Sequence, residues 1–211
     1  MRKDSHCLLG VLLCTVISNS ALGQSRSDII ERCAQLADLD LPETTVTAAS
    51  LEAADQFVPP GEEAALRLPD FCRLEGVISP TVGFEVWLPI AGWNGKLQLV
   101  GNGGMAGTIS YRAMGRALAR GYATASTDTG HRAGPVPFDA SWASGRMDLI
   151  EDFGHRALHV TTERAKSVVR AFYAEAPQYS YYVGCSKGGQ QGLMEAQRYP
   201  DDFDGIIAGN P

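Results

Sequence analysis

The sequence lacks the features that mark nucleic-acid-binding, membrane-spanning or fibrous proteins. It has no stretch dense in Lys and Arg, and its formal net charge of −6 disfavours binding to phosphate backbones. No apolar run reaches the roughly 20 residues of a spanning helix. Glycine (23) and proline (11) occur near their usual frequencies, which excludes a collagen-like or disordered chain. The 211 residues therefore suit one folded domain that binds small molecules or catalyses a reaction.

The first 23 residues have the pattern of a secretory signal. Arg2 and Lys3 precede an apolar run over 7–17, and Ala21-Leu22-Gly23 places small residues at −3 and −1 before Gln24. The run is about 11 residues, too short to span a bilayer. We expect cleavage after residue 23, a mature domain over 24–211 that is secreted or periplasmic, and no membrane attachment. An uncleaved anchor is the alternative.

Cysteine is scarce, and its count in the mature chain is odd. Of five cysteines, Cys7 and Cys14 lie in the predicted signal, which leaves Cys33, Cys72 and Cys185 in an oxidising compartment. An odd count means a free thiol, an intermolecular bond or a partner outside this chain.

Helix and strand patterns alternate after an opening hairpin, which is the order of an α/β domain with a mainly parallel sheet. Apolar residues at helical spacing predict helices over 27–39, 111–120, 147–176 and 188–198. Short apolar or alternating runs predict strands over 72–78, 83–88, 96–100, 122–127, 179–184 and 205–208, the first two forming an antiparallel hairpin. The pattern over 44–66 is weak. Residues 131–145 have no period and are predicted to form a functional or mobile loop.

The sharpest motif is Gly184-Cys185-Ser186-Lys187-Gly188, which matches G-x-S-x-G between a predicted strand and a predicted helix. This context is that of a nucleophile elbow, a turn too tight for bulky residues two places from the nucleophile. It would present the Ser186 hydroxyl at the carboxyl end of the sheet, at a helix N-terminus. The alternative is a glycine-rich turn without catalytic function.

A second glycine-rich segment, residues 100–107, follows the predicted strand 96–100. In hydrolases of this architecture, such a loop supplies one oxyanion N–H, and the residue after the nucleophile supplies the other. A plain turn without a binding role is one alternative, and a phosphate-binding turn is the other. The segment lacks the Lys-Ser/Thr of a P-loop and the G-x-G-x-x-G spacing of a leading βαβ unit, which disfavours a nucleotide site.

These motifs, with several others between positions 33 and 211, resemble the tannase and feruloyl esterase family of secreted α/β-hydrolases, which includes the mono(hydroxyethyl) terephthalate hydrolases. The resemblance rests on the segments 92–96, 101–104, 126–131, 181–189 and 198–209. It implies a serine carboxylic ester hydrolase acting on phenolic or aromatic esters. It also implies that Ser186 is the nucleophile and that the Gly104 and Lys187 amides form the oxyanion hole.

The resemblance also assigns the cysteines. It implies a Cys33–Cys72 bridge and a disulfide between Cys185 and a cysteine beside the catalytic histidine. The family's acid, histidine and calcium-binding lid all follow position 211, and all four histidines here precede Ser186. We therefore expect the N-terminal portion of an α/β-hydrolase sheet, without lid, C-terminal strands or cofactor. The triad is then incomplete in this chain, and Cys185 is an exposed free thiol.

Other polar residues are weaker candidates. His155 and His159 are four apart, a spacing that can bind metal, but the helical wheel predicts a solvated face and no metal site. Asp128 and His131, with Gly103, are pocket candidates, although a loop-ordering hydrogen bond is the favoured role of the first two. The Lys187 side chain is expected to be solvated or to attract an anionic substrate.

A second function class stays open at this point. The chain could be a non-catalytic exported binding module, a hydrolase relic that keeps its pocket but lacks a base. A His-Cys pair further along the gene would favour the enzyme, whereas a stop codon after Pro211 would favour the binding module.

Overall fold

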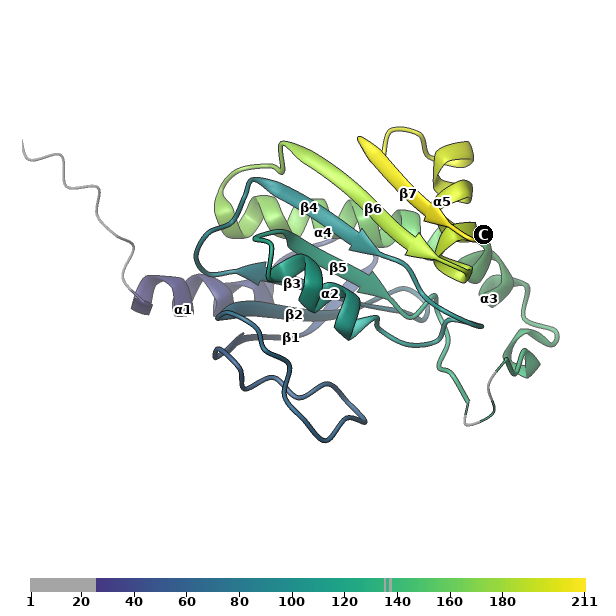
Figure 1. Cartoon of the computed structure of the whole chain (residues 1–211), viewed down its shortest axis with the longest axis horizontal. Coiled ribbons are helices and arrows are strands. Elements are labelled where there is room, and N and C mark those ends of the chain that lie inside the picture. The colour runs from purple at the N-terminus through teal and green to yellow at the C-terminus, as the bar shows by residue number, and fades with distance from the viewer. Residues whose placement is uncertain (1–25, 135, 137) are drawn as a thin grey trace, which may run out of the picture.

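The computed structural model describes residues 26–134, 136 and 138–211, and these build one seven-stranded sheet flanked by helices (Figure 1). The predicted signal, residues 1–23, lies outside the described residues. The strands are β1 (Thr44–Glu52), β2 (Phe71–Ile78), β3 (Val82–Pro89), β4 (Lys96–Val100), β5 (Ala123–Thr127), β6 (Tyr179–Cys185) and β7 (Gly205–Gly209). The helices are α1 (Arg26–Gln35), α2 (Tyr111–Leu118), α3 (Met147–Glu151), α4 (Ala157–Tyr173) and α5 (Lys187–Arg198), with short 3₁₀ turns at Leu36–Asp38 and Ser141–Ala143.

The sheet has two parts with different strand directions. Its order is β1-β2-β3-β5-β4-β6-β7. The pairs β1–β2, β2–β3 and β3–β5 are antiparallel, whereas β5–β4, β4–β6 and β6–β7 are parallel. The predicted hairpin is confirmed. The sheet is mixed rather than mainly parallel, because β1, β2 and β3 add three antiparallel pairs to the three parallel ones.

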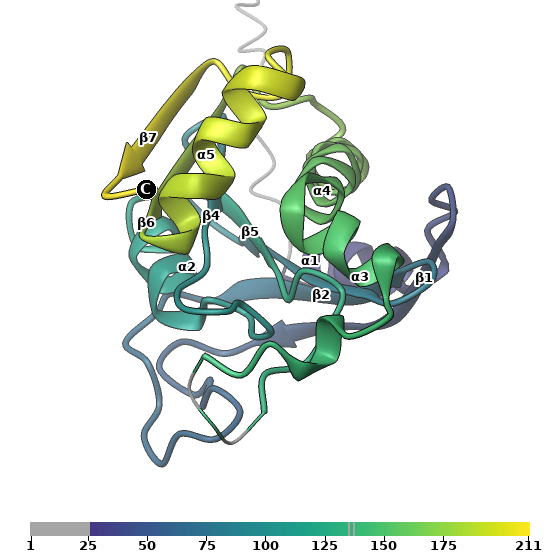
Figure 2. The ribbon, with the colours of Figure 1, turned by 90° about the vertical axis from the view of Figure 1, so that its right-hand side faces the viewer.

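Helices cover the two faces of the sheet unequally (Figure 2). On one face α4 and α5 pack over the central and parallel strands, and α1 joins α4 through a hydrogen bond from Arg32 Nη1 to the Phe172 carbonyl. A large apolar cluster lies beneath them and includes Leu74, Leu99 and Tyr182. On the other face α2 packs over a smaller cluster centred on Trp87.

The predicted bridge between Cys33 and Cys72 is present. It joins α1 to β2, with the two Cα atoms 5.7 Å apart and a sequence separation of 39. Both half-cystines are buried. On the chain-entropy account, closing a loop of this length stabilises the fold by roughly 3–4 kcal/mol.

One expectation about secondary structure was wrong, and one strand was not predicted. The single helix predicted over 147–176 is interrupted, because residues Asp152–Arg156 form a π-helical turn between α3 and α4 and the helix ends at Tyr173. The weak region 44–66 contains a full strand, β1. Its hydrophobic alternation is diluted because it is an edge strand with a register shift between Val46 and Ala48.

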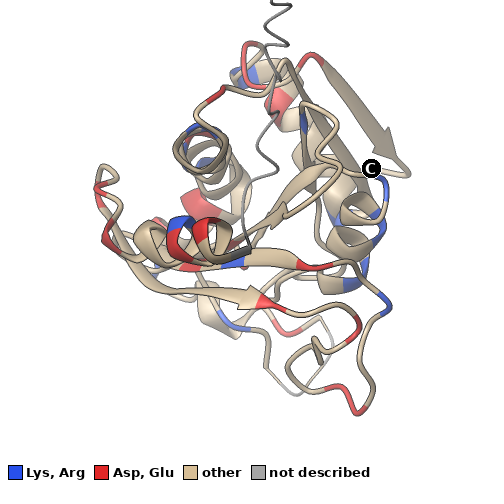
Figure 3. Ribbon diagram, turned by 90° about the vertical axis from the view of Figure 1, so that its left-hand side faces the viewer, with Lys and Arg blue, Asp and Glu red and all other residues tan. Residues whose placement is uncertain are grey.

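Charged residues are distributed over most elements of the fold (Figure 3). Among the described helices, none combines the length and the apolar character that crossing a bilayer would require.

Candidate active site

The candidate site lies where two neighbouring parallel strands, β4 and β6, send the chain to opposite faces of the sheet. The connection after β4 leads to α2 on one face, and β6 leads directly into α5 on the other. In open α/β sheets, such a divergence leaves a crevice at the carboxyl ends of the strands, where ligands bind. The glycine-rich loop and Ser186 follow these two strand ends.

The backbone at Ser186 has the strained conformation of a nucleophile elbow. Its φ is 60° and its ψ is −118°, a region that residues with a Cβ rarely occupy. The Ser186 N–H donates to the Gly209 carbonyl (2.9 Å), and its carbonyl accepts from Gln190 N–H (3.0 Å) as α5 begins. Strain of this kind persists only where the surroundings hold it.

Glycines around Ser186 allow that turn. A Cβ at Gly184 would lie 2.4 Å from the Gly188 carbonyl oxygen, and one at Gly101 would lie 2.6 Å from the Gly188 Cα. A Cβ at Gly189 would lie 2.3 Å from the Gly209 oxygen. Three backbone segments therefore touch at the elbow, and each contact requires a residue without a side chain.

The Ser186 side chain is exposed, and its hydroxyl has no hydrogen-bond partner among the described residues. The three histidines of the described chain bond elsewhere: His131 to the Met105 carbonyl, His155 to Tyr199, and His159 to Asp202. The described part of the chain thus presents a serine without a general base.

The glycine-rich loop after β4 is bonded directly to the elbow. Gly188 N–H donates to the Asn102 carbonyl (2.8 Å). The Asn102 side-chain amide donates to the Thr108 and Thr127 carbonyls (2.8 and 2.9 Å), and Gln191 Nε2 donates to Asn102 Oδ1 (2.9 Å). Asn102 therefore fixes the loop to both β5 and α5.

Two amides near the elbow are free to bind an anion. Gly104 has a φ of 56°, and Lys187 is the first residue of α5, where helical N–H groups lack intrahelical acceptors. Neither N–H donates a hydrogen bond to another described residue. That both converge on one oxyanion stays a prediction.

A cavity of about 250 Å³ lies beside the loop and includes Gly103, Gly104 and His131 in its wall. Phe138, three-quarters exposed, has its ring 3.6 Å from where a Cβ on Gly104 would stand. His131 Nε2–H donates to the Met105 carbonyl (2.8 Å), and its ring stacks on Trp142 at 3.8 Å. Burial lowers the pKa of His131, so the ring is neutral at pH 7.

Asp128 orders a turn and is absent from the wall of that cavity. Its Oδ1 accepts from the Gly83 and Gly130 amides (2.9 and 2.8 Å). Burial raises the pKa of Asp128 to about 6, although both hydrogen bonds act against the rise. The loop-ordering role favoured from the sequence is confirmed for this residue.

The expectation for the Lys187 side chain was wrong. The side chain is buried, its Nζ donates to the Phe153 carbonyl (3.0 Å), and it lies 3.3 Å from the centroid of the Phe153 ring. Burial lowers the pKa of Lys187 to about 8. Sequence reasoning could not show this contact, because Phe153 lies in the π-helical turn Asp152–Arg156, 34 positions before Lys187.

Cys185 is an exposed free thiol, as predicted. Asn210 Nδ2 lies 3.8 Å from its sulfur. The thiol also borders a groove of about 790 Å³ on the face that carries α2. Ser186 is not in the wall of that groove, although Gly103 of the glycine-rich loop and Gly184 of the elbow are.

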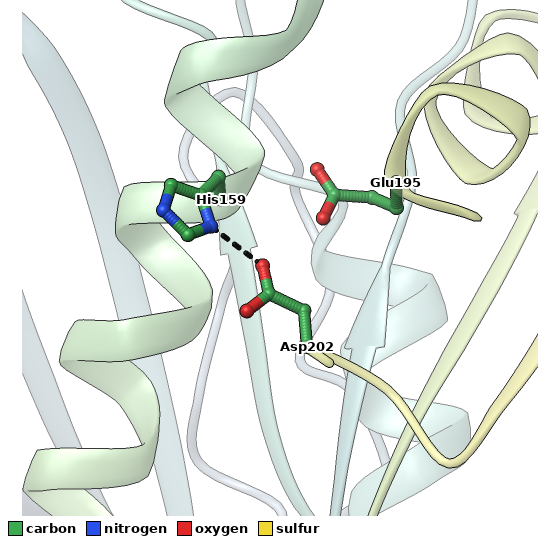
Figure 4. A group of neighbouring side chains, drawn as sticks. All are labelled: His159, Glu195 and Asp202. Atoms are coloured by element: carbon green, nitrogen blue, oxygen red, sulfur yellow. Dashed lines mark hydrogen bonds and ion pairs between the residues drawn. The ribbon is translucent and has the colours of Figure 1, made fainter. Parts of the chain in front are cut away.

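The expectation of a solvated face for His155 and His159 was also wrong. His155 Nδ1 pairs with Tyr199 Oη (2.7 Å), and His159 Nδ1 pairs with Asp202 Oδ2 (2.7 Å) while its ring stacks on Tyr199 at 3.9 Å. The two histidines are half-buried because α5 and the turn after it pack against α4. Figure 4 shows His159 beside Glu195 and Asp202.

Sequence reasoning missed Gln191 and Tyr182, which support the elbow from beneath. Tyr182 Oη donates to the Gly188 carbonyl (2.8 Å), and Gln191 Oε1 accepts from Asn102 N–H (3.1 Å). Nothing in a single sequence marks these residues, because an apolar strand position and a polar helix position do not reveal their partners.

Comparison with known proteins identifies relatives along most of the chain. A family model described as "Tannase and feruloyl esterase" matches residues 67–211. An uncharacterized esterase of Xanthomonas campestris is 46% identical over 207 residues, covering 96% of this chain and 35% of that protein. A probable feruloyl esterase of Arthroderma benhamiae is 40% identical over 164 residues, covering 72% of this chain and 30% of the relative. The chain thus spans about a third of the length of these curated relatives.

Solved structures agree with the fold. Feruloyl esterase B from Aspergillus oryzae superposes with a TM-score of 0.76 at 30% identity, covering 85% of this chain and 36% of that one. A tannin acyl hydrolase from Aspergillus niger superposes with a TM-score of 0.65 at 20% identity, covering 86% of this chain and 36% of that one, and supports the fold alone. The α/β-hydrolase-type sheet predicted from the sequence is therefore confirmed.

Proposed function

The chain belongs to the tannase and feruloyl esterase family, and we propose that Ser186 is the nucleophile of a carboxylic ester hydrolase acting on phenolic or aromatic esters. The observation that carries the proposal is the strained Ser186 backbone, which presents an exposed hydroxyl at the N-terminus of α5. A turn without a chemical role would have no reason to keep a residue with a Cβ in that conformation.

The reaction is acyl transfer in two steps. Ser186 Oγ attacks the ester carbonyl carbon while a base takes its proton, and the tetrahedral oxyanion forms hydrogen bonds to the Gly104 and Lys187 amides. Collapse breaks the ester C–O bond, and the alcohol leaves with the proton. Water then attacks the acyl-enzyme in the same way, releasing the acid and restoring the serine.

The base comes from outside the described residues in this proposal. The three described histidines are bonded to partners other than Ser186, and the curated relatives are about three times as long as this chain. We expect a polypeptide of these 211 residues alone to leave an activated phenyl ester intact, because an unassisted serine hydroxyl is a weak nucleophile at neutral pH. Hydrolysis by that polypeptide that depends on Ser186 would contradict this.

The substrate class is supported by the cavity beside Gly104. The exposed Phe138 ring borders it, and an aromatic ring on a substrate can pack against such a side chain. The neutral His131 lies in the same wall, bonded to the loop carbonyl next to Gly104. An apolar wall next to free amides suits an aromatic ester better than a charged substrate.

Export is part of the proposal. The segment 1–23 has the features of a secretory signal, and the Cys33–Cys72 disulfide suits an oxidising compartment. We propose a secreted or periplasmic location for the mature chain. Mass spectrometry of the N-terminus of protein recovered from the medium or periplasm tests this, and a start at Met1 would contradict it.

The central test is Ser186→Ala in the complete protein, assayed on a methyl ester of an aromatic acid. We expect kcat to fall by about 10⁶-fold, the scale seen when the nucleophile of a serine hydrolase is removed. Ser167→Ala is the matched control, because Ser167 is an exposed serine on α4 whose hydroxyl donates only to the Glu163 carbonyl. Unchanged hydrolysis by Ser186→Ala would refute the assignment.

A further inference from the structure

Three ionisable side chains from three separate segments meet at the end of α5 away from Ser186. His159 comes from α4, Glu195 from α5, and Asp202 from the segment between α5 and β7 (Figure 4). One ligand atom from each lies within 4.8 Å of the others. His159 Nδ1 and Asp202 Oδ2 are 2.7 Å apart. The cluster is independent of the proposed esterase chemistry.

Glu195 is the unusual member of the cluster. Its side chain is completely buried, and both carboxylate oxygens lack a hydrogen-bond donor among the described residues. Figure 4 shows the carboxylate directed toward His159 and Asp202. Buried polar atoms are almost always paired, so two unpaired oxygens on one buried carboxylate indicate a missing partner.

Glu85 shows what a satisfied buried carboxylate looks like in this protein. It is as inaccessible as Glu195, at 3% exposure, but its oxygens accept four hydrogen bonds. Two come from Arg73 (2.8 and 2.7 Å), one from Trp87 Nε1 (2.9 Å) and one from Tyr111 Oη (3.0 Å). Among the described residues, Glu195 has no cation or donor in these roles, because the nearby Lys166 donates to the Asp202 main-chain carbonyl (2.6 Å).

The Glu195 carboxylate has to be neutralised by a cation or by a proton. The Asp202 carboxylate belongs to the same buried cluster, so two negative charges would lie side by side in a site with little water. A shared proton would neutralise one charge. A divalent cation would neutralise both and would also give the free Glu195 oxygens a partner.

We propose that His159, Glu195 and Asp202 bind one divalent metal ion of the zinc type. An imidazole with two carboxylates suits Zn²⁺ and similar transition metals, whereas Mg²⁺ and Ca²⁺ prefer oxygen ligands alone. A water molecule completes the four-coordinate shell. Zinc ligands at about 2.0–2.1 Å lie roughly 3.3 Å from one another, so His159 Nδ1 and Asp202 Oδ2 separate slightly when the ion replaces their hydrogen bond.

The surroundings of His159 fit a metal ligand. Its ring is held by stacking on Tyr199 at 3.9 Å and 6° between planes, which leaves Nδ1 facing the carboxylates. The other ring nitrogen, Nε2, lies 4.0 Å from the Glu163 carboxylate, the kind of outer partner that orients metal-bound histidines. The His159 side chain is 27% exposed and that of Asp202 11%, which leaves an entry path from solvent.

The test uses untagged protein freed of metal with EDTA, with Cys185 alkylated because an exposed thiol binds zinc by itself. Titration with ZnCl₂ is followed by calorimetry and by thermal unfolding. We expect one equivalent to bind and Tm to rise by roughly 5–10 °C at a hundredfold excess over Kd. Substituting Co²⁺ should give the visible absorption bands of a four-coordinate site.

Glu195→Gln and His159→Gln are the ligand variants, with Asp202→Asn as a replacement if either fails to fold. Each should weaken binding by at least about 10- to 100-fold, since outer-sphere losses already cost that much. His155→Gln is the matched control, because His155 lies one turn earlier on the same side of the helix but pairs with Tyr199. It should bind zinc as the parent does.

Two results would overturn the proposal. The absence of saturable binding, with Glu195→Gln as stable as the parent, would mean that a proton neutralises the carboxylate pair. Binding that survives Glu195→Gln and His159→Gln, or that His155→Gln abolishes equally, would place the ion at other ligands.

Discussion

The two ends of α5 are held by different kinds of contact. At its start, around Ser186, the close contacts are between backbone atoms of glycine residues. The serine itself has a strained backbone and an exposed side chain. At its other end, the contacts are between side chains, and a buried Glu195 is left with unpaired oxygens. The first end has a strained backbone, whereas the other end has a buried carboxylate without a hydrogen-bond donor among the described residues.

The difference shows where function can be recognised. Backbone strain is imposed by residues close in sequence, so the motif formed by Gly184, Ser186 and Gly188 indicates the strained turn. Buried charge arises from residues brought together by folding, so His159, Glu195 and Asp202 share no sequence pattern. Features that depend on packing between distant elements become visible only in the structure.

The largest effect on stability and kcat is expected from Gly184→Ala, which changes the strained turn at the start of α5. The added Cβ would meet the Gly188 carbonyl group at 2.4–2.5 Å, and backbone cannot yield as a side chain can. We expect a stability loss of about 1–3 kcal/mol and a fall in kcat beyond the roughly 10²-fold that a 1 Å displacement costs, because the nucleophile and the Lys187 amide move together. Chemical denaturation and steady-state kinetics measure both.

Gly154→Ala is the control for that variant. A Cβ there would meet nothing within 4 Å, and its φ is not positive. Its kcat should be unchanged and its stability equal or slightly higher. Equal behaviour of the two alanine variants would show that the elbow is not tightly constrained.

A smaller effect is expected from Gly104→Ala, which perturbs one of the two predicted oxyanion donors. Its φ of 56° is costly for alanine by roughly 1–2 kcal/mol, so the amide should rotate away. We expect kcat to fall by up to about 10²–10³-fold, with little change in KM. Unchanged kcat would transfer the role to Gly103.

Lys187→Met tests the buried cation at the same end of α5 through pH. Burial lowers the folded-state pKa of Lys187 to about 8, below the ordinary lysine value of 10.5, so the unfolded state binds more protons between these two pH values. Stability of the parent relative to Lys187→Met should therefore rise as pH increases from about 8 to 10.5 and stay level below 8. Urea denaturation at a series of pH values measures this. A constant difference between the two proteins would contradict the burial of that charge.

The smallest effect is expected from Tyr199→Phe at the charged end of the helix. The substitution removes the hydrogen bond to His155 (2.7 Å) but keeps a ring to stack on His159. Stability should fall by about 1 kcal/mol, and kcat should be unchanged because Ser186 lies at the other end of α5. A large loss of kcat would mean that the two ends are coupled.

Much of the fold could be predicted from the sequence. The spacing of apolar residues and the turn residues predicted six of the seven strands, the hairpin and the elbow, because each of these depends on residues close in sequence. The strand Thr44–Glu52 was missed, since an edge strand with an irregular register carries little alternation. The break in the helix at residues 152–156 was missed because a π-helical turn has no sequence signature.

The candidate site was only half predictable. Ser186 and the glycines follow from a motif, whereas the family resemblance supplied the Cys33–Cys72 bridge and the expectation of a free Cys185. The burial of Lys187 against Phe153 and the pairing of His159 with Asp202 were not predicted, because both side chains were expected to be solvated. A helical wheel treats a helix as if one face meets solvent, whereas here α5 and the adjoining turn cover part of that face.

The most direct test of the central claim is covalent labelling of the complete protein with a fluorophosphonate, which reacts with activated serines. We predict one adduct, located at Ser186 by peptide mass spectrometry, absent from Ser186→Ala, and slowed by an aromatic ester added beforehand. An adduct on another serine, or none at all in protein that hydrolyses the ester, would contradict the assignment of Ser186 as the nucleophile.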